Sequence, residues 1–253
     1  MSRTIVIGDL HGCHEETLQL LQKCKYAAGD RVVFLGDLVD RGPDNDKCVD
    51  LVRSIEQKQG SAACVLGNHE QKHLWYKKCE AAGIDVTSMP ASHVHTRSQL
   101  KDEHFDYFET LPLFLRLPEF NAACVHAGAF PNRSLEDQTA NHLLHIQMIN
   151  PAEGENSYWV SKSPKDYSFW VHYWNGDERL IFGHSVLDKP LISSHAVGID
   201  GGAVFGLELH ALILPEWEIV SVKGIKDWGK GSRGTQAKPI EKFLIYDDVS
   251  TFS

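Results

Sequence analysis

The chain has 253 residues, of which 42% are hydrophobic and 23% are charged, and its formal net charge at pH 7 is -9. This composition is typical of a folded globular protein and excludes a disordered chain, which would have lower hydrophobicity and a larger charge excess. The acidic balance argues against general nucleic-acid binding, because such binding needs clustered lysine and arginine to neutralise phosphates. We expect a single domain over residues 1–253.

The sequence predicts a cytoplasmic protein without a membrane partner. No stretch reaches the roughly 18 to 20 apolar residues of a membrane span. The beginning, "MSRTIVIGD", leads directly into a strand pattern and has no apolar signal-peptide core. The six cysteines include no C-x-x-C pair, so we expect buried free thiols and neither a disulfide framework nor a zinc knuckle.

The N-terminal third alternates strand-like and helix-like segments. Short apolar runs followed by glycine occur at "TIVIGD" (4–9), "RVVFLGD" (31–37) and "SAACVLGN" (61–68). Between these runs, "CHEETLQLLQKCKY" and "DNDKCVDLVRSIEQK" space their apolar residues as amphipathic helices do. This order predicts a mostly parallel sheet with right-handed crossovers.

The middle of the chain is less regular. Residues 70–110 are helical in pattern but polar, which predicts a helical excursion on the surface. We then expect strands at "LPLFLRL" (111–117) and "NAACVHAGAF" (121–130), with a turn near Pro118, and a helix within "LEDQTANHLLHIQMIN" (135–150).

The C-terminal part predicts four short strands, "RLIFGH", "HAVGIDGG", "ELHALILPE" and "WEIVSVK", arranged as a meander. Residues 226–253 have the composition of a loose tail. The whole pattern predicts an α/β (α+β) fold in which two packed sheets carry helices on their outer faces.

Polar clusters follow the strands at their ends. The three N-terminal runs lead into "GDLHG", "GDLVDRG" and "GNHE", and two later runs end in glycine-flanked histidines, "ACVHAG" and "LIFGHS". Ligands bind beyond the carboxyl ends of parallel strands, so these clusters should meet in space. The candidate metal donors are Asp9, His11, Asp37, Asn68, His126 and His184. Oxygen and imidazole donors suit Mn, Fe or Zn, and a set of this size fits two ions sharing a bridging carboxylate.

With these motifs the chain resembles the calcineurin-like metallophosphoesterases, in their phosphoprotein-phosphatase branch, over residues 4–222. The resemblance implies a four-layer sandwich of two mixed sheets flanked by helices. It also implies a phosphatase that uses direct in-line attack of a metal-bound hydroxide, without a phosphoenzyme. By this resemblance Asp9 and His11 hold the first ion, Asp37 bridges, and the second ion is held by Asn68, His126 and His184.

The resemblance also implies three catalytic side chains and a choice of metals. His69 would protonate the leaving oxygen, Asp40 would orient His69, and Arg41 would bind the phosphoryl oxygens. The two divalent ions are expected to be Mn²⁺, although Fe, Zn, Ni or Co also suit the donors. The chain departs from many relatives where they carry a second arginine, because His172 stands there. His172 and Arg179 are further candidates for substrate binding, and Arg133 is an alternative to Arg179.

The segments "GGAVFGLELHALILPE" and "YWNGDERLIFGH" are more similar to the bacterial diadenosine tetraphosphatase (symmetrical)-like group than to large Ser/Thr phosphatases. We therefore expect a hydrolase of nucleoside polyphosphates or phosphomonoesters, with a capped RNA end as a further candidate substrate. The alternative is a serine/threonine or dual-specificity phosphoprotein phosphatase. A non-catalytic phosphate-binding module is disfavoured because the full donor set is present. A dinucleotide-binding oxidoreductase is disfavoured because "IGDLHG" is not G-x-G-x-x-G.

The remaining histidines and aromatic residues are given structural roles. Histidines outside the motifs are expected to be surface or core residues: His14, His73, His93, His95, His104, His142, His145, His195 and His210. The segment "HVHTR" (93–97) has the alternative of overhanging the site. An aromatic cluster is expected to pack in the core, or alternatively to stack on a nucleobase: Trp159, Phe169, Trp170, Tyr173 and Trp174.

Overall fold

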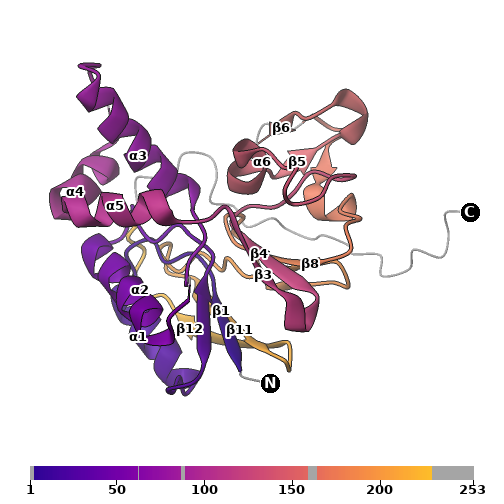
Figure 1. Cartoon of the computed structure of the whole chain (residues 1–253), viewed down its shortest axis with the longest axis horizontal. Coiled ribbons are helices and arrows are strands. Elements are labelled where there is room, and N and C mark those ends of the chain that lie inside the picture. Colours follow the sequence, from indigo (N-terminus) through magenta and orange to yellow (C-terminus); the bar gives the residue numbers. More distant parts are fainter. Residues whose placement is uncertain (1–2, 62, 87–88, 159–163, 230–253) are drawn as a thin grey trace, which may run out of the picture.

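The structure is a computed structural model that describes residues 3–61, 63–86, 89–158 and 164–229. The expectations for Trp159 and for most of the tail lie outside these residues. Figure 1 shows two central sheets side by side, with helices α1 (His14–Lys23) and α2 (Asn45–Gln59) on the outer side of the first sheet. This arrangement confirms the predicted fold class, two mixed sheets flanked by helices.

The first sheet contains, in spatial order, β12 (Glu218–Lys223), β11 (Glu208–Leu214), β1 (Thr4–Ile7) and β2 (Arg31–Phe34). Strands β1 and β2 run parallel, with Val6 beside Val33, whereas β11 is antiparallel to β1 and forms a hairpin with β12. The sheet is therefore mixed and not mostly parallel. The third strand expected at residues 61–68 is reduced to a single parallel bridge between Phe34 and Cys64.

The second sheet has the order β3 (Phe114–Leu117), β4 (Ala122–Val125), β8 (Arg179–Phe182), β10 (Ala196–Gly198) and β9 (Leu191–Ile192). Strands β3 and β4 are antiparallel and are joined through a 3-10 helix at Pro118–Phe120, which confirms the predicted turn. The predicted four-strand meander is wrong. Strands β8 and β10 are parallel neighbours in this sheet, while β11 and β12 pair in the other one.

Alternate residues of the central strands serve different cores, because successive side chains of a strand point to opposite faces. Ile5 and Ile7 pack with α1 and α2, whereas Val6 faces the second sheet. Ile181 and Val197 of the second sheet meet it in the same cluster. Burial on both faces explains why these strands are apolar throughout and not alternating.

Two further layers lie above the strand ends in Figure 1. One consists of α3 (Asn68–Ala81), α4 (Ala91–Gln99) and α5 (Asp102–Thr110). The other consists of α6 (Ala140–His145) and a small sheet of β6 (Ser157–Tyr158), β5 (Met148–Ile149) and β7 (Ser168–Phe169). The helix expected within residues 135–150 is thus limited to its middle, and its end is a strand.

Two packing expectations are confirmed. Phe169, Trp170, Tyr173 and Trp174 of the aromatic cluster pack in the core of the second sheet, where Trp170 lies edge-on against Phe182 with ring centroids 5.0 Å apart. All the cysteines are buried and free. In the described part of the chain, no helix combines the length and the apolar character needed to cross a membrane.

Candidate active site

The polar clusters lie in loops that follow the strands, and several of their residues have strained backbone conformations. Asp37, Asp40 and Arg41 have φ values of +48°, +73° and +71°, and His11 and His184 have +46° and +61°. Non-glycine residues in this left-handed region cost of order 1–3 kcal/mol each and cluster at functional sites. The surrounding structure must therefore hold these loops in place.

Glu70 holds the loop that follows β2. Its Oε2 accepts hydrogen bonds from the backbone N–H groups of Asp37 and Gly67, at 2.9 and 3.1 Å. Its Oε1 accepts from Leu38 and Val39, at 2.8 and 3.2 Å. As the third residue of α3, Glu70 also caps the start of that helix. One buried carboxylate thus fixes α3 against the Asp37 loop, a role that sequence reasoning missed although "GNHE" contains this glutamate.

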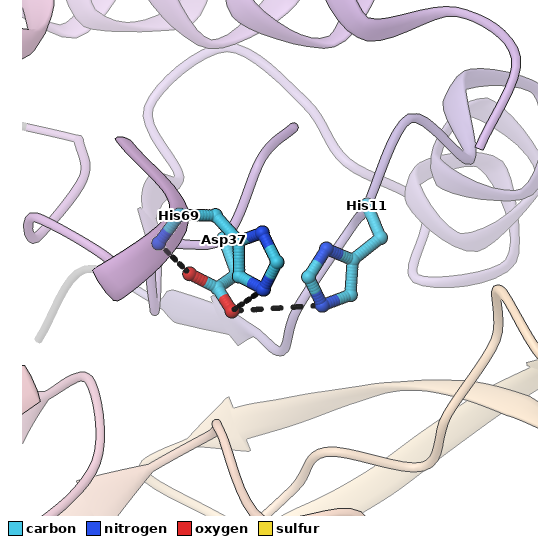
Figure 2. A group of neighbouring side chains, drawn as sticks. All are labelled: His11, Asp37 and His69. Carbon is cyan, nitrogen blue, oxygen red and sulfur yellow. Dashed lines mark hydrogen bonds and ion pairs between the residues drawn. The ribbon is translucent and has the colours of Figure 1, made fainter. Parts of the chain in front are cut away.

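Asp37 lies at the centre of the site (Figure 2). Its Oδ1 accepts a hydrogen bond from the backbone N–H of His69 at 3.0 Å and lies 3.4 Å from Nε2 of His126. Its Oδ2 lies 3.5 Å from Nε2 of His11 and 3.8 Å from Nε2 of His69. Burial opposes ionisation of Asp37, but the surrounding imidazoles, first His126, outweigh it and hold the pKa of this carboxyl well below its usual range.

The side-chain amide of Asn68 contacts two histidines that follow strands of the second sheet. Nδ1 of His126 donates to the Leu35 carbonyl at 2.6 Å, so a neutral His126 presents the lone pair of Nε2 to the amide oxygen of Asn68 at 2.8 Å. The same amide oxygen lies 2.9 Å from Nδ1 of His184. Burial lowers the pKa of both histidines, which favours their neutral form. Acceptor atoms that face one another in this way are suited to a shared cation.

Asp9 lies against the backbone of the loop that follows β8. Its two oxygens accept from the backbone N–H of His184 at 3.1 and 3.0 Å. A side chain at position 183 would place a Cβ only 1.9 Å from the Asp9 carboxylate, so Gly183 is required there. Burial, followed by repulsion from Asp200 and Asp37, raises the pKa of Asp9 well above its usual range. Asp200 was not foreseen in this role, although it follows β10 as the other polar residues follow their strands.

The donor atoms form two groups that share Asp37. His11, Asp37 and His69 make one group, and Asp37, His126 and His184 make the other, with ligand atoms within 4.8 Å of one another in each. The first group contains His69 where the resemblance implies Asp9, and Asp9 contacts the backbone of His184, a member of the second group. A cluster of buried carboxylates and neutral imidazoles fits two divalent cations with a bridging carboxylate.

The carboxylate of Asp40 contacts a further set of histidines. Its Oδ2 lies 2.6 Å from Nδ1 of His69 and 3.3 Å from Nε2 of His93, and its Oδ1 lies 2.8 Å from Nε2 of His73. Burial opposes ionisation, but hydrogen bonds from His69 and His73 outweigh it and hold the pKa of Asp40 well below its usual range. Asp40 therefore acts as a buried anion that orients the imidazole of His69.

His73 is a buried histidine, as expected, but both His73 and His93 also contact Asp40. His73 follows His69 by four residues on α3, so the two side chains share one helix face, and this spacing was the available signal. His93 comes from the segment "HVHTR", and its contact with Asp40 agrees with the alternative that this segment overhangs the site.

Among the arginines considered, Arg41 reaches the cluster. Its guanidinium contacts Nε2 of His11 and lies 5.7 Å from the ring centroid of Phe205. Arg179 begins β8, and its guanidinium lies over Trp217, 4.0 Å from the ring centroid, at the end of the strand away from His184. Arg133 pairs with Glu155, and His172 ends a short 3-10 helix, where it is exposed. A compensating role for Arg179 or Arg133 therefore receives no support from their positions.

The fold and the Asp37 cluster define a metal-dependent phosphoesterase, and comparison with known proteins gives the family. Residues 2–205 match the model of the calcineurin-like phosphoesterases, and the chain belongs to this family. Members of the family hydrolyse phosphate esters at a pair of divalent metal ions.

Several relatives cover most of the chain. The bis(5'-nucleosyl)-tetraphosphatase PrpE [asymmetrical] of Oceanobacillus iheyensis is 31% identical over 86% of this chain and 90% of its own length. The protein of the same name from Anoxybacillus flavithermus is 29% identical, with 86% and 92% covered. A crystal structure assigned as a diadenosine tetraphosphatase superposes with a TM-score of 0.72 and 28% identity, over 88% of this chain and 94% of that one. The names of the two relatives specify asymmetrical cleavage, whereas the sequence motifs had pointed towards the symmetrical group.

Proposed function

We propose that this protein hydrolyses nucleoside polyphosphates, with dinucleoside tetraphosphates as the preferred class, at two divalent ions that are Mn²⁺ in the active enzyme. The observation that carries the reaction type is the convergence of imidazole and carboxylate donors on the buried Asp37. The substrate class is supported by the names of relatives that span most of the chain.

We assign the ions to the donors as follows. Asp9 and His11 would hold the first ion, Asp37 would serve both ions, and Asn68, His126 and His184 would hold the second. With divalent cations bound, these donors would provide a nucleophile at neutral pH and offset the charge on the phosphoryl oxygens. The chain contributes the positions of these donors, because Glu70 fixes the loop that carries Asp37.

His69 is the proposed general acid. Its Nδ1 is held by Asp40 at 2.6 Å, so protonated His69 has its Nε2–H free to point towards the side of the site where Asp37 lies. From there it donates a proton to the oxygen that leaves phosphorus. Because the anionic Asp40 is bound by more than one imidazole, the ring of His69 is held in one orientation before substrate arrives.

Arg41 is the proposed phosphoryl-binding residue. Its guanidinium lies beside His11 at the edge of the donor cluster. A planar guanidinium can bind two phosphoryl oxygens at once and remains charged at any working pH.

We further propose the asymmetrical mode of cleavage, because the relatives that align over most of this chain bear that name. Water then cleaves the anhydride between the phosphate attached to one nucleoside and the next phosphate in the chain. Diadenosine tetraphosphate would yield ATP and AMP, whereas symmetrical cleavage would yield two molecules of ADP.

In the test, the protein is stripped of metal and reloaded with Mn²⁺. It is then incubated separately with diadenosine tetraphosphate and with a phosphoserine peptide. Nucleotide products are separated by chromatography, and phosphate released from the peptide is measured. We expect ATP and AMP from the dinucleotide and little phosphate from the peptide. Formation of ADP alone would refute the asymmetrical mode. Rapid release from the peptide without dinucleotide turnover would replace the proposed substrate with a phosphoprotein.

A further inference from the structure

A cavity of about 730 Å³ adjoins the first turn of α3, next to the proposed metal centre. We call it the α3 cavity, and it is lined in part by Asn68, His69, Gln71, Lys72, Trp75 and Lys78. Its volume lies within the roughly 300–1,000 Å³ of small-molecule sites. At one end it begins at a proposed metal ligand and the proposed general acid, so a molecule bound at the centre could extend into it.

Helix geometry places the cavity residues along one line. Residues three or four apart share a face of a helix, so Asn68, Lys72 and Trp75 lie on successive turns. At a rise of 1.5 Å per residue, Trp75 stands about 10 Å beyond Asn68 along α3. Lys77 falls on the opposite face, where it lies 3.8 Å from each of Asp102 and Asp106 of α5. The helix therefore has one face packed on α5 and another lining the cavity.

The cavity face of α3 combines an aromatic ring with positive charge. The side chain of Trp75 is 50% exposed, and the ammonium of Lys72 lies 4.3 Å from its ring centroid. Within the described residues, neither Lys72 nor Lys78 has a carboxylate within ion-pair distance, in contrast to Lys77. In a chain whose formal net charge is -9, these ammonium groups are available to an anionic ligand.

The opposite wall comes from α6. Its His145 also lines the cavity, and Nε2 of this histidine lies 3.3 Å from the side-chain oxygen of Gln71. The cavity is thus bounded by elements far apart in the sequence, and Figure 1 shows α3 and α6 on either side of the strand ends. Polar groups at both walls favour a ligand with hydrogen-bonding edges as well as an aromatic face.

We propose that the α3 cavity binds the nucleotide portion of a dinucleoside polyphosphate that lies beyond the cleaved phosphate. Its base stacks on Trp75, and its bridging phosphates contact Lys72, with Lys78 adding to the positive potential. This inference rests on the proposed function and names the residues that would select dinucleotides over smaller phosphate esters. A small phosphomonoester is too short to reach Trp75, so the cavity would favour dinucleotides without changing the chemistry at Asp37.

The test compares Trp75→Ala and Lys72→Ala with two matched controls, Trp75→Phe, which keeps a ring, and Lys77→Ala, which removes a charge from the opposite face. Two quantities are measured: KM and kcat for diadenosine tetraphosphate and for p-nitrophenyl phosphate with Mn²⁺, and the Kd of a hydrolysis-resistant, methylene-bridged diadenosine tetraphosphate by calorimetry. Base stacking on an aromatic side chain and charge-assisted contacts to phosphate each correspond to roughly tenfold in affinity.

We expect Trp75→Ala and Lys72→Ala each to raise KM for the dinucleotide and Kd for its analogue about tenfold. Trp75→Phe and Lys77→Ala should change them less than threefold, and p-nitrophenyl phosphate hydrolysis should stay unchanged in all variants. The inference is overturned if wild type does not bind the analogue, or if both alanine variants bind it as wild type does. Loss of analogue binding in these variants, with no dinucleotide turnover by wild type, would support the cavity while refuting the proposed function.

Discussion

Replacing Glu70 by glutamine tests whether this carboxylate holds the Asp37 loop. The substitution keeps the shape of the side chain but turns one of its oxygens into an NH₂ group. Each oxygen of Glu70 accepts two backbone N–H groups, those of Asp37 and Gly67 at Oε2 and those of Leu38 and Val39 at Oε1. Whichever way the amide turns, two buried N–H donors therefore face another donor.

The expected loss of stability follows from these contacts. A buried N–H group left without an acceptor costs about 1–3 kcal/mol, so two such groups lower the free energy of unfolding by about 2–6 kcal/mol. For a chain of this size each kcal/mol corresponds to roughly 2–4 °C, which predicts a fall in Tm of roughly 4–24 °C. Because the Asp37 loop also relaxes, turnover should fall by about 100-fold, the effect of a displacement of about 1 Å at a reacting centre.

The assay is thermal and chemical unfolding of Glu70→Gln beside Glu80→Gln, together with kcat for each. Glu80 lies on the same helix but is exposed, and its contact with Arg97 is a surface ion pair worth at most about 1 kcal/mol. If Glu70→Gln unfolds within 0.5 kcal/mol of wild type, or retains full turnover, the argument that Glu70 positions Asp37 fails.

Three further changes probe the site and the core. His69→Asn should lower kcat by about 10²- to 10⁴-fold while metal content stays unchanged, and retained turnover would remove its role as general acid. His73→Leu deletes a hydrogen bond to Asp40. Because a hydrogen bond to a charged group contributes about as much free energy as a tenfold change in rate, kcat should fall about tenfold with KM unaltered. His95→Leu, at an exposed histidine, is the control, and equal losses in both variants would count against a role for His73. Burial raises the pKa of Cys24 to about 11 and that of Cys124 to about 12, so Ellman's reagent at pH 8 should modify no cysteine of the native chain and all of them after unfolding.

Much of the donor cluster could be predicted because it depends on a local rule. A strand that ends in glycine followed by Asp, Asn or His presents that side chain at the carboxyl edge of a sheet. Asp37, after Gly36, and His184, after Gly183, obey this rule on different sheets, and the structure brings them into one donor group. The two sheets were also predictable, since their strands carry continuous apolar runs.

The network around Asp40 could not be predicted in the same way. His93 reaches Asp40 only because α4 packs beside α2, and no spacing in the sequence reveals that contact. The parallel pairing of β8 with β10 was missed for a related reason. Parallel neighbours usually need a long crossover, but here the connection is residues 183–195, which contain only the short strand β9 and therefore resemble a hairpin loop.

Metal content tests the central claim most directly. Wild-type protein and Asp37→Asn are stripped with a chelator, dialysed against Mn²⁺ and analysed by inductively coupled plasma mass spectrometry, with dinucleotide turnover measured at each stage. Because Asp37 lies between both donor groups, we predict close to two ions per wild-type chain, turnover that disappears on chelation and returns with Mn²⁺, and loss of both ions and turnover in Asp37→Asn. Turnover that persists in the stripped protein, or full metal content in Asp37→Asn, would contradict the account.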